Sequence, residues 1–150
     1  MANNYLTYKV LPEIKIIVEY FEGPIDLQDL ITFQMNQLND KNCKIEYSDI
    51  TDLRNAEFII KKDDLKRYVN FVKENDAKQG NRKVAIIADT PLLTAITMLY
   101  STYTENLLLN NKVFSTQEAA YQWLELPEDH YSIINIALDE LKDKSNREKQ

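Results

Sequence analysis

The segment KVAIIADTPLLTA, residues 83–95, is the most informative stretch of the chain about its fold. It contains an apolar run from Val84 to Ala88 without polar alternation, which is typical of a strand buried on both faces in a parallel sheet. Thr90 then has the chemistry of a helix N-cap, and Pro91 that of a first helical residue. The segment therefore predicts a central strand that leads directly into a helix. The residues expected to face inward from this helix are Leu92, Leu93, Ile96, Tyr100 and Tyr103.

An N-terminal hairpin is expected at the start of the chain. YLTYKV (5–10) and EIKIIVEYF (13–21) are rich in β-branched and aromatic residues, and Pro12 marks a turn between them. A further short strand is expected at CKIEYSDI (43–50). The segment that follows it, residues 51–58, is interpreted as a polar loop.

Two more helices fit between these strands. IDLQDLITFQMNQLND (25–40) has one apolar face, with Asp26 placed to cap the helix and Asp29 three residues after it. DDLKRYVNFVKEN (63–75) carries an apolar stripe with charged residues opposite. Because strands and helices alternate, the strands are expected to pair in parallel with right-handed crossovers. The predicted fold class is α/β: a mixed sheet of about five strands, mostly parallel with one antiparallel edge strand, flanked by about four helices plus a C-terminal helix.

A second junction between a strand and a helix is predicted by VFSTQEAAYQWL (113–124). Ser115 is placed to cap the helix, and Glu118, three residues later, is placed to return a hydrogen bond to it. Trp123, the only tryptophan, is expected to pack against the sheet.

A final helix is predicted by EDHYSIINIALDELKDK (128–144), whose apolar stripe is expected to pack against another apolar surface. The helix either packs on the same chain or pairs with its copy in a homodimer. The residues proposed for this interface are Ile133, Ile134, Leu138 and Leu141. The chain is accordingly divided into one domain over residues 1–126, this additional helix over 127–144 and a flexible tail over 145–150.

The composition argues against several classes of function. A net charge of −6 is unfavourable for a surface that neutralises many phosphates, so no nucleic-acid partner is expected. Gly23 and Gly80 are the only glycines, and they lie too far apart to build a phosphate loop. Cys43 is the only cysteine, which excludes an internal disulfide and a cysteine-based zinc cluster. No stretch approaches the roughly 18 apolar residues of a membrane span. A cytoplasmic protein without a metal or another cofactor is therefore expected.

Three segments together resemble a known group of domains. DLRNAEF (52–58), VAIIADTPLLTA (84–95) and VFSTQEAAYQWL (113–124) are similar, in their order and spacing, to an uncharacterised bacterial branch of the SpoIIAA-like group. This group has the STAS fold of anti-sigma-factor antagonists and is also grouped with the lipid-binding CRAL-TRIO fold. The resemblance covers residues 5–126. It implies a non-enzymatic interaction or regulatory domain that binds a protein partner or itself, and, as the alternative, a domain that binds or senses a small apolar ligand or lipid.

One feature of the antagonists is missing from this chain. Antagonists of the phosphoswitch type carry a serine, followed by a second serine or a glycine, at the start of the helix after the middle strand. The corresponding region, DITDLRNAEFIIKKDD (49–64), contains neither residue, and Thr51 lies too early to take that role. The resemblance therefore implies the fold and an interaction role without the phosphorylation switch.

Polar side chains are expected at the ends of two predicted strands: Asp49, Asp52 and Arg54 at one, and Asp89 and Thr90 at the other. Ligands of open α/β sheets bind outside the carboxyl ends of the strands, where paired acids could hold a divalent cation or accept a phosphoryl group. The favoured interpretation is instead that Asp52 and Arg54 form an ion pair and that Asp89 satisfies backbone donors at a helix start. No catalytic residue is assigned. The candidates for ligand or partner binding are Asp52, Arg54, Asp89, Thr90 and Tyr103.

Two single residues are interpreted as structural. His130, the only histidine, is expected at the surface or at the cap of the last helix, because no nucleophile setting accompanies it. Cys43 is expected to be a small packed side chain and not a reactive thiol.

Overall fold

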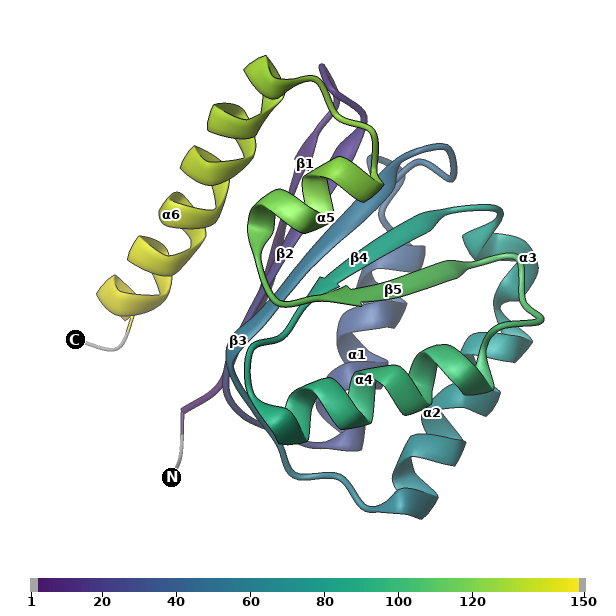
Figure 1. Ribbon diagram of the computed structural model, residues 1–150. Coiled ribbons are helices and arrows are strands. Elements are labelled where there is room, and N and C mark those ends of the chain that lie inside the picture. Colours follow the sequence, from purple (N-terminus) through teal and green to yellow (C-terminus); the bar gives the residue numbers. More distant parts are fainter. Residues whose placement is uncertain (1–2, 149–150) are drawn as a thin grey trace.

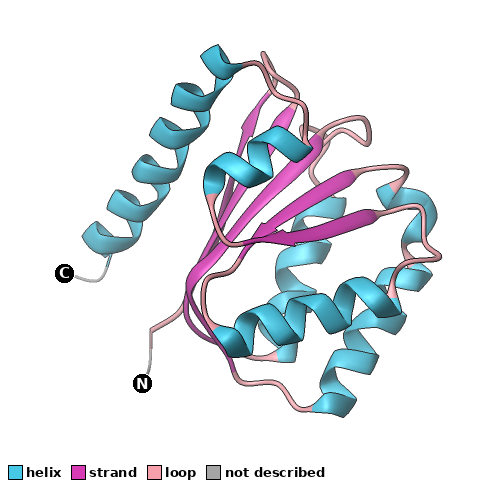
Figure 2. Ribbon diagram, viewed as in Figure 1, coloured by secondary structure: helices cyan, strands magenta, loops and turns pink. Residues whose placement is uncertain are grey.

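The computed structural model describes residues 3–148, which form one five-stranded sheet with helices on both faces (Figures 1 and 2). The strand order is β1-β2-β3-β4-β5, with β1 antiparallel to β2 and every other neighbouring pair parallel. The strands are β1 (Tyr5–Leu11), β2 (Ile16–Ile25), β3 (Ser48–Phe58), β4 (Lys83–Ile87) and β5 (Asn110–Phe114). The helices are α1 (Leu27–Leu38), α2 (Lys62–Glu74), α3 (Asp76–Gln79), α4 (Pro91–Tyr103), α5 (Gln117–Trp123) and α6 (Tyr131–Glu148), with a 3-10 turn, η1, at Glu128–His130. The predicted fold class is confirmed.

The junction of β4 and α4 has the predicted structure. β4 lies between β3 and β5, and its residues Val84 to Ile87 are all buried, as expected for an apolar run covered on both faces. The Thr90 hydroxyl accepts a hydrogen bond from the backbone N–H of Leu93, and Pro91 is the first helical residue. One expectation for this helix was wrong, because Leu92 is 66% exposed. At the second position of the helix its side chain points away from the sheet.

The two faces of the sheet carry different helices. Helices α1, α2 and α4 cover one face, which we call the pocket face, and α5 and α6 cover the other, which we call the α6 face (Figure 1). Each face has its own hydrophobic core. Residues alternate between the two cores along each strand, so that Phe21 of β2 belongs to the pocket face and Tyr20 to the α6 face.

Strand β3 is longer than the sequence indicates. The segment 51–58, interpreted as a polar loop, continues the strand and pairs with β2 up to Phe58. An irregularity in the register leaves two residues of β3, Leu53 and Arg54, opposite one residue of β2, Phe21. Such a bulge reverses the alternation, so that Asn55 points to the α6 face, where it bonds the Tyr20 hydroxyl. A strand with a bulge needs no continuous apolar alternation, which explains why the polar segment was misread.

The start of α5 differs by one residue from the expectation. The N-cap is Thr116, whose hydroxyl accepts a hydrogen bond from the backbone N–H of Ala119, and not Ser115. The predicted capping box of Ser115 and Glu118 is therefore wrong in register. Trp123 does pack at the sheet, with its ring 5.6 Å from that of Phe114.

Helix α6 packs on its own chain and extends beyond the expected boundary. The interface candidates Ile134, Leu138 and Leu141 are buried in the core of the α6 face, so a partner cannot reach them. Only Ile133 remains exposed, at 39%. The segment 145–148, expected in a flexible tail, is helical, and Ser145 is buried with its hydroxyl bonded to Glu22. The rest of the proposed tail lies outside the described residues.

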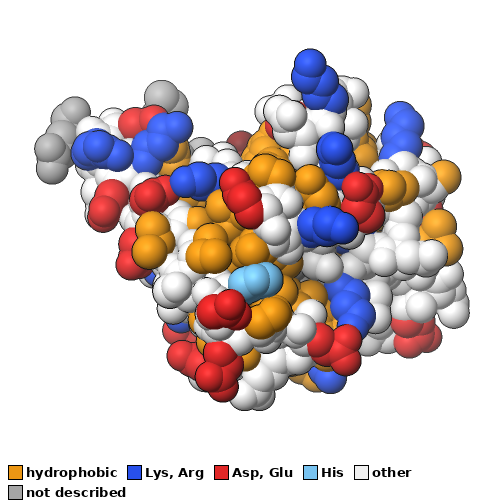
Figure 3. Space-filling view, turned by 90° about the horizontal axis from the view of Figure 1, so that it is seen from above, with side chains coloured by type: hydrophobic (Ala, Val, Ile, Leu, Met, Phe, Trp, Pro, Cys, Tyr) orange, Lys and Arg blue, Asp and Glu red, His pale blue; other side chains and the backbone are white. Residues whose placement is uncertain are grey.

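No helix within residues 3–148 is both long enough and apolar enough to cross a membrane. Figure 3 shows the end of the molecule that lies uppermost in Figure 1, where hydrophobic side chains surround the histidine and acidic and basic side chains are interspersed. The histidine, His130, ends η1 at the start of α6, as expected for a residue at a helix start.

Candidate functional site

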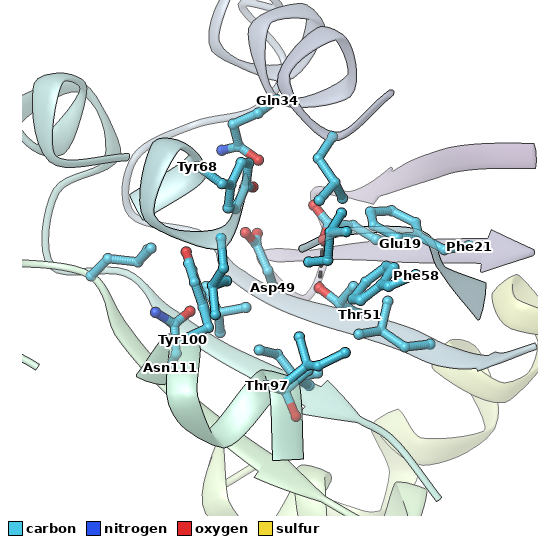
Figure 4. Close-up of a pocket in the computed structure, with 18 of the residues that line it drawn as sticks. Glu19, Phe21, Gln34, Asp49, Thr51, Phe58, Tyr68, Thr97, Tyr100 and Asn111 are labelled. Carbon is cyan, nitrogen blue, oxygen red and sulfur yellow. Dashed lines mark hydrogen bonds between the residues drawn. The ribbon is translucent and has the colours of Figure 1, made fainter. Parts of the chain in front are cut away.

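A pocket of about 100 Å³ lies on the pocket face, between the sheet and helices α1, α2 and α4 (Figure 4). Its floor consists of buried sheet residues, whereas Gln34, Ile60 and Ile96, from the surrounding helices and a loop, are half-buried. The pocket is therefore deepest at the sheet and opens between the helices. Most of its wall is apolar. Its large apolar side chains include Phe21, Leu53, Phe58, Leu65, Ile86 and Ile96.

Glu19 of β2 is the first polar residue of the floor, and it is only 5% exposed. Its position in the alternation places it on the pocket face together with Phe21. One carboxylate oxygen accepts a hydrogen bond from the Thr51 hydroxyl, and the other accepts one from the amide of Gln37 at 2.5 Å. The carbonyl oxygen of that same amide is buried and makes no hydrogen bond within residues 3–148.

Asp49 of β3 is the second acid of the floor, at 4% exposure. Figure 4 shows its carboxyl group directed away from the sheet, toward the space between Tyr68 and Tyr100. Arg82, which precedes β4, donates from Nη1 to Asp49 at 3.2 Å and from Nη2 to the backbone carbonyl of Lys44 at 2.9 Å. Arg82 is equally buried, and its Nε has no partner in the described part of the chain.

The electrostatics of this floor favour neutral acids. Burial raises the pKa of Asp49 well above its usual range, and the charge of Glu19 raises it further, although Arg82 acts in the opposite direction. Burial also raises the pKa of Glu19, against the hydrogen bonds from Thr51 and Gln37 and the charge of Arg82. The single positive charge of Arg82 therefore neutralises the negative charge of only one of the two interacting carboxylates. Both acids of the floor are therefore harder to ionise than exposed carboxyl groups.

Two tyrosines complete the polar side of the pocket. Tyr68 of α2 and Tyr100 of α4 lie with their rings 5.7 Å apart. Burial raises the pKa of each hydroxyl well above its ordinary value, so both remain neutral. No hydrogen bond from the Tyr68 hydroxyl occurs among the residues described.

Two of the five binding candidates, Asp52 and Arg54, lie together on the α6 face, and a third, Asp89, is near enough for its charge to act on Arg54. Asp52 accepts hydrogen bonds from Nε and Nη2 of Arg54, both at 2.9 Å, and Lys142 of α6 lies 3.6 Å from the same carboxylate. The pKa of Arg54 is raised chiefly by its hydrogen bonds to Asp52 and to a smaller extent by the charge of Asp89. The favoured interpretation of Asp52 and Arg54 as an ion pair is confirmed, but the pair lies on a strand and not in a loop.

The other two candidates have different positions. Thr90 caps α4, while Tyr103 ends the same helix, roughly 20 Å away at about 1.5 Å per residue. A single site cannot include both. Residues 3–148 also contain no group of three histidine, cysteine or acidic side chains arranged to hold a metal ion. Burial raises the pKa of Cys43 to about 11, which fits a packed thiol and not a reactive one.

Sequence reasoning missed the floor of the pocket almost completely. Glu19 stands in the run IIVEYF, where a charged residue in an otherwise apolar strand was a signal that deserved weight. Asp49 was noted only as a residue at a strand end, and Arg82 was not singled out. The pairing of these residues depends on the register of β2, β3 and β4, which sequence spacing does not reveal.

Comparison with known proteins bears on the fold. No family model matches the sequence, and no significant match is found among curated proteins. Among solved structures, an uncharacterised protein of the DUF3478 family from Shewanella loihica PV-4, described as having a SpoIIAA-like fold, superposes with a TM-score of 0.53. The alignment covers 83% of this chain and 95% of that one, at 14% identity. The chain has a SpoIIAA-like fold. The resemblance inferred from the sequence is thus confirmed for the fold, and a SpoIIAA-like fold at this identity carries no activity with it.

Proposed function

We propose that the chain is a non-enzymatic binding domain whose pocket holds a small, mainly apolar ligand, in a STAS-like regulatory or sensing role. The observation that carries this proposal is the pocket between the sheet and α1, α2 and α4, whose apolar wall surrounds a few converging polar groups. Small-molecule sites have this composition. Of the two roles that the resemblance implies, ligand binding therefore has the more specific support.

A fragment screen with two variants tests this proposal. Ile96 lines the pocket from α4, whereas Leu92 of the same helix is exposed, so Ile96→Trp fills the pocket and Leu92→Trp is the matched control. Two-dimensional NMR with small apolar fragments should detect binding to the wild type and the control. Binding to Ile96→Trp should be weaker by tenfold or more. Absence of any binder, or equal binding by both variants, would contradict the proposal.

A second candidate function is self-association through α4. The outer side of this helix exposes Leu92, Met98 and Leu99, at 66%, 55% and 37%. Apolar side chains that share one exposed helix face are suited to a protein contact. If a second copy covers this face, sedimentation velocity should show a dimer for the wild type and a monomer for Met98→Glu. A monomeric wild type at high concentration would exclude this dimer.

A further inference from the structure

Two buried carboxyl groups, those of Glu19 and Asp49, line the floor of the proposed ligand pocket. They bring four acceptor oxygens to it. The donors bonded to these oxygens are the Thr51 hydroxyl, the amide of Gln37 and the guanidinium of Arg82. Since each carboxylate oxygen can accept two hydrogen bonds, acceptor capacity remains unused in a buried place. A ligand that brings donors would use this capacity.

We propose that the ligand carries one cationic amino group, which bonds the carboxylates of Glu19 and Asp49 while the apolar part of the molecule contacts the wall of the pocket. This inference rests on the proposed function, because it requires that the pocket binds a small molecule. An ammonium group is a compact cation with three donors, which the oxygens of the two carboxylates can accept.

The charges that face the floor support a cation and disfavour an anion. Asp49 on β3, Arg82 before β4, Tyr68 on α2 and Tyr100 on α4 are the ionisable groups that act on Glu19 or are acted on by it. The loop residue Cys43 acts with Asp49 but stays neutral, because burial raises its pKa. With both acids ionised, the floor has one negative charge in excess, which an ammonium group neutralises. A carboxylate ligand would add to that charge instead.

Binding of an amine should also move a proton. Burial raises the pKa values of Glu19 and Asp49, so both acids hold a proton more firmly than exposed carboxyl groups do. An ammonium group on the floor favours their ionised forms, so a proton held there passes to solvent. A neutral ligand releases no proton in this way, so proton release distinguishes the two kinds of ligand.

The size of the pocket restricts the apolar part of the ligand. At about 100 Å³ the pocket is smaller than an engineered cavity of roughly 150 Å³ that holds benzene, but it is open at its mouth. A short chain, or one ring that extends into the mouth, therefore fits. The rings of Phe21, Phe58, Tyr68 and Tyr100 line it, and aromatic faces also favour a nearby cation. Benzylamine combines both features and is a suitable probe.

Calorimetry with three probes of equal size tests the inference. Benzylamine, benzyl alcohol and benzoate are titrated at pH 7 in two buffers that differ in ionisation enthalpy. Benzylamine should bind roughly ten- to one-hundred-fold more tightly than benzyl alcohol, the range expected for a hydrogen bond to a charged group, and benzoate least of all. Only the heat of benzylamine binding should depend on the buffer.

Variants locate the effect. Glu19→Gln keeps the shape of the side chain and should abolish both the preference for benzylamine and the proton release, while benzyl alcohol still binds. Asp52→Asn alters a buried acid on the opposite face and should preserve both properties. Circular dichroism shows whether Glu19→Gln folds. If it does not, Asp49→Asn replaces it and should likewise abolish the preference for benzylamine.

Each outcome decides the inference. Equal or tighter binding of benzyl alcohol or benzoate, or an unchanged preference in Glu19→Gln, overturns it and leaves the proposed function standing. The same holds if benzylamine fails to bind while neutral fragments bind. If no fragment binds at all, the proposed function fails and this inference fails with it.

Discussion

The two faces of the sheet each bury an acid beside an arginine, and the two acids, Asp49 and Asp52, are close neighbours on β3. On the α6 face, Asp52 accepts two hydrogen bonds from the side chain of Arg54 and lies near Lys142. On the pocket face, Asp49 shares Arg82 with Glu19, and Arg82 bonds it at the longer distances of 3.2 and 3.4 Å.

The outcome for ionisation is opposite on the two faces. Burial alone would raise the pKa of Asp52, but the hydrogen bonds and charge of Arg54, together with Lys142, outweigh it and lower the pKa. For Asp49 burial and the charge of Glu19 prevail, and the pKa is raised. An acid that is fully paired contributes to the fold, whereas an acid left short of donors beside a pocket is suited to a ligand.

The α6 face extends its pairing into a network that joins three elements. Arg54 of β3 donates to Gln117 of α5 at 2.8 Å, and Gln117 and Tyr121 both donate to Asn135 of α6. The network explains why α6 belongs to the same unit as the sheet. It leaves little polar capacity for a ligand on that face.

The largest expected effect is a difference in how much Asp52 and Asp49 stabilise the folded state. Asp52→Asn should lower the free energy of unfolding by about 2 kcal/mol, because two cations lose their buried partner while Arg54 remains partly hydrated. Asp49→Asn should cost less than about 1 kcal/mol, because burial and the charge of Glu19 already disfavour the ionised carboxylate that the amide replaces. Urea unfolding at pH 7 measures both. A larger cost for Asp49→Asn would reverse the comparison.

The pH dependence of stability should have opposite signs for the two acids. The pKa of Asp49 is raised in the folded state, so its contribution is fully present below the unfolded value of about 4 and is lost as pH rises through the folded value. The pKa of Asp52 is lowered, so its contribution is present above about 4 and is lost as pH falls through the folded value.

Difference curves isolate each contribution. The stability of the wild type minus that of Asp49→Asn should decrease from pH 4 upward, by about 1.4 kcal/mol for each unit by which the pKa is raised. The wild type minus Asp52→Asn should decrease when the pH falls below 4. Urea unfolding from pH 3 to pH 9 gives both curves, and curves with the same sign would refute the contrast.

The parts of the fold that depend on local chemistry were predictable from the sequence, whereas the parts that depend on distant contacts were not. The unit β4–α4 and the start of α1 were predictable because they depend on local chemistry: an apolar run, Thr90 and Pro91 in one case, and the capping box of Asp26 and Asp29 in the other. The bulge in β3 was not predictable, because its polar residues are stabilised by partners distant in sequence, such as Tyr20 and Gln117.

The candidate site depends even more on distant contacts. Asp52 and Arg54 could be paired from their spacing, since they are close in sequence and of opposite charge. Glu19, Asp49 and Arg82 come from three separate parts of the chain, and only the register of the sheet brings them together. The length of α6 was missed because its polar last turn, with Ser145 bonded to Glu22, has no apolar stripe to mark it.

Smaller losses of stability than that of Asp52→Asn are expected at the helix caps, one on each face. Thr116→Ala at α5 and Thr90→Ala at α4 should each lower the stability by about 1 kcal/mol, because each hydroxyl accepts a backbone hydrogen bond. Ser115→Ala is the control for α5 and should be nearly neutral. Thermal unfolding of the three variants measures these losses. A larger loss for Ser115→Ala than for Thr116→Ala would indicate that Ser115, and not Thr116, caps α5.

The most direct test of the central claim is an NMR titration of the side-chain carboxyl carbons of Asp49 and Asp52 in one sample. Asp49 should titrate above the usual range of aspartate and Asp52 below it. Saturating benzylamine should lower the pKa values of the Asp49 and Glu19 pair and leave that of Asp52 unchanged. Titration of both aspartates below the usual range would contradict the account, because the pocket face would then be as fully paired as the α6 face.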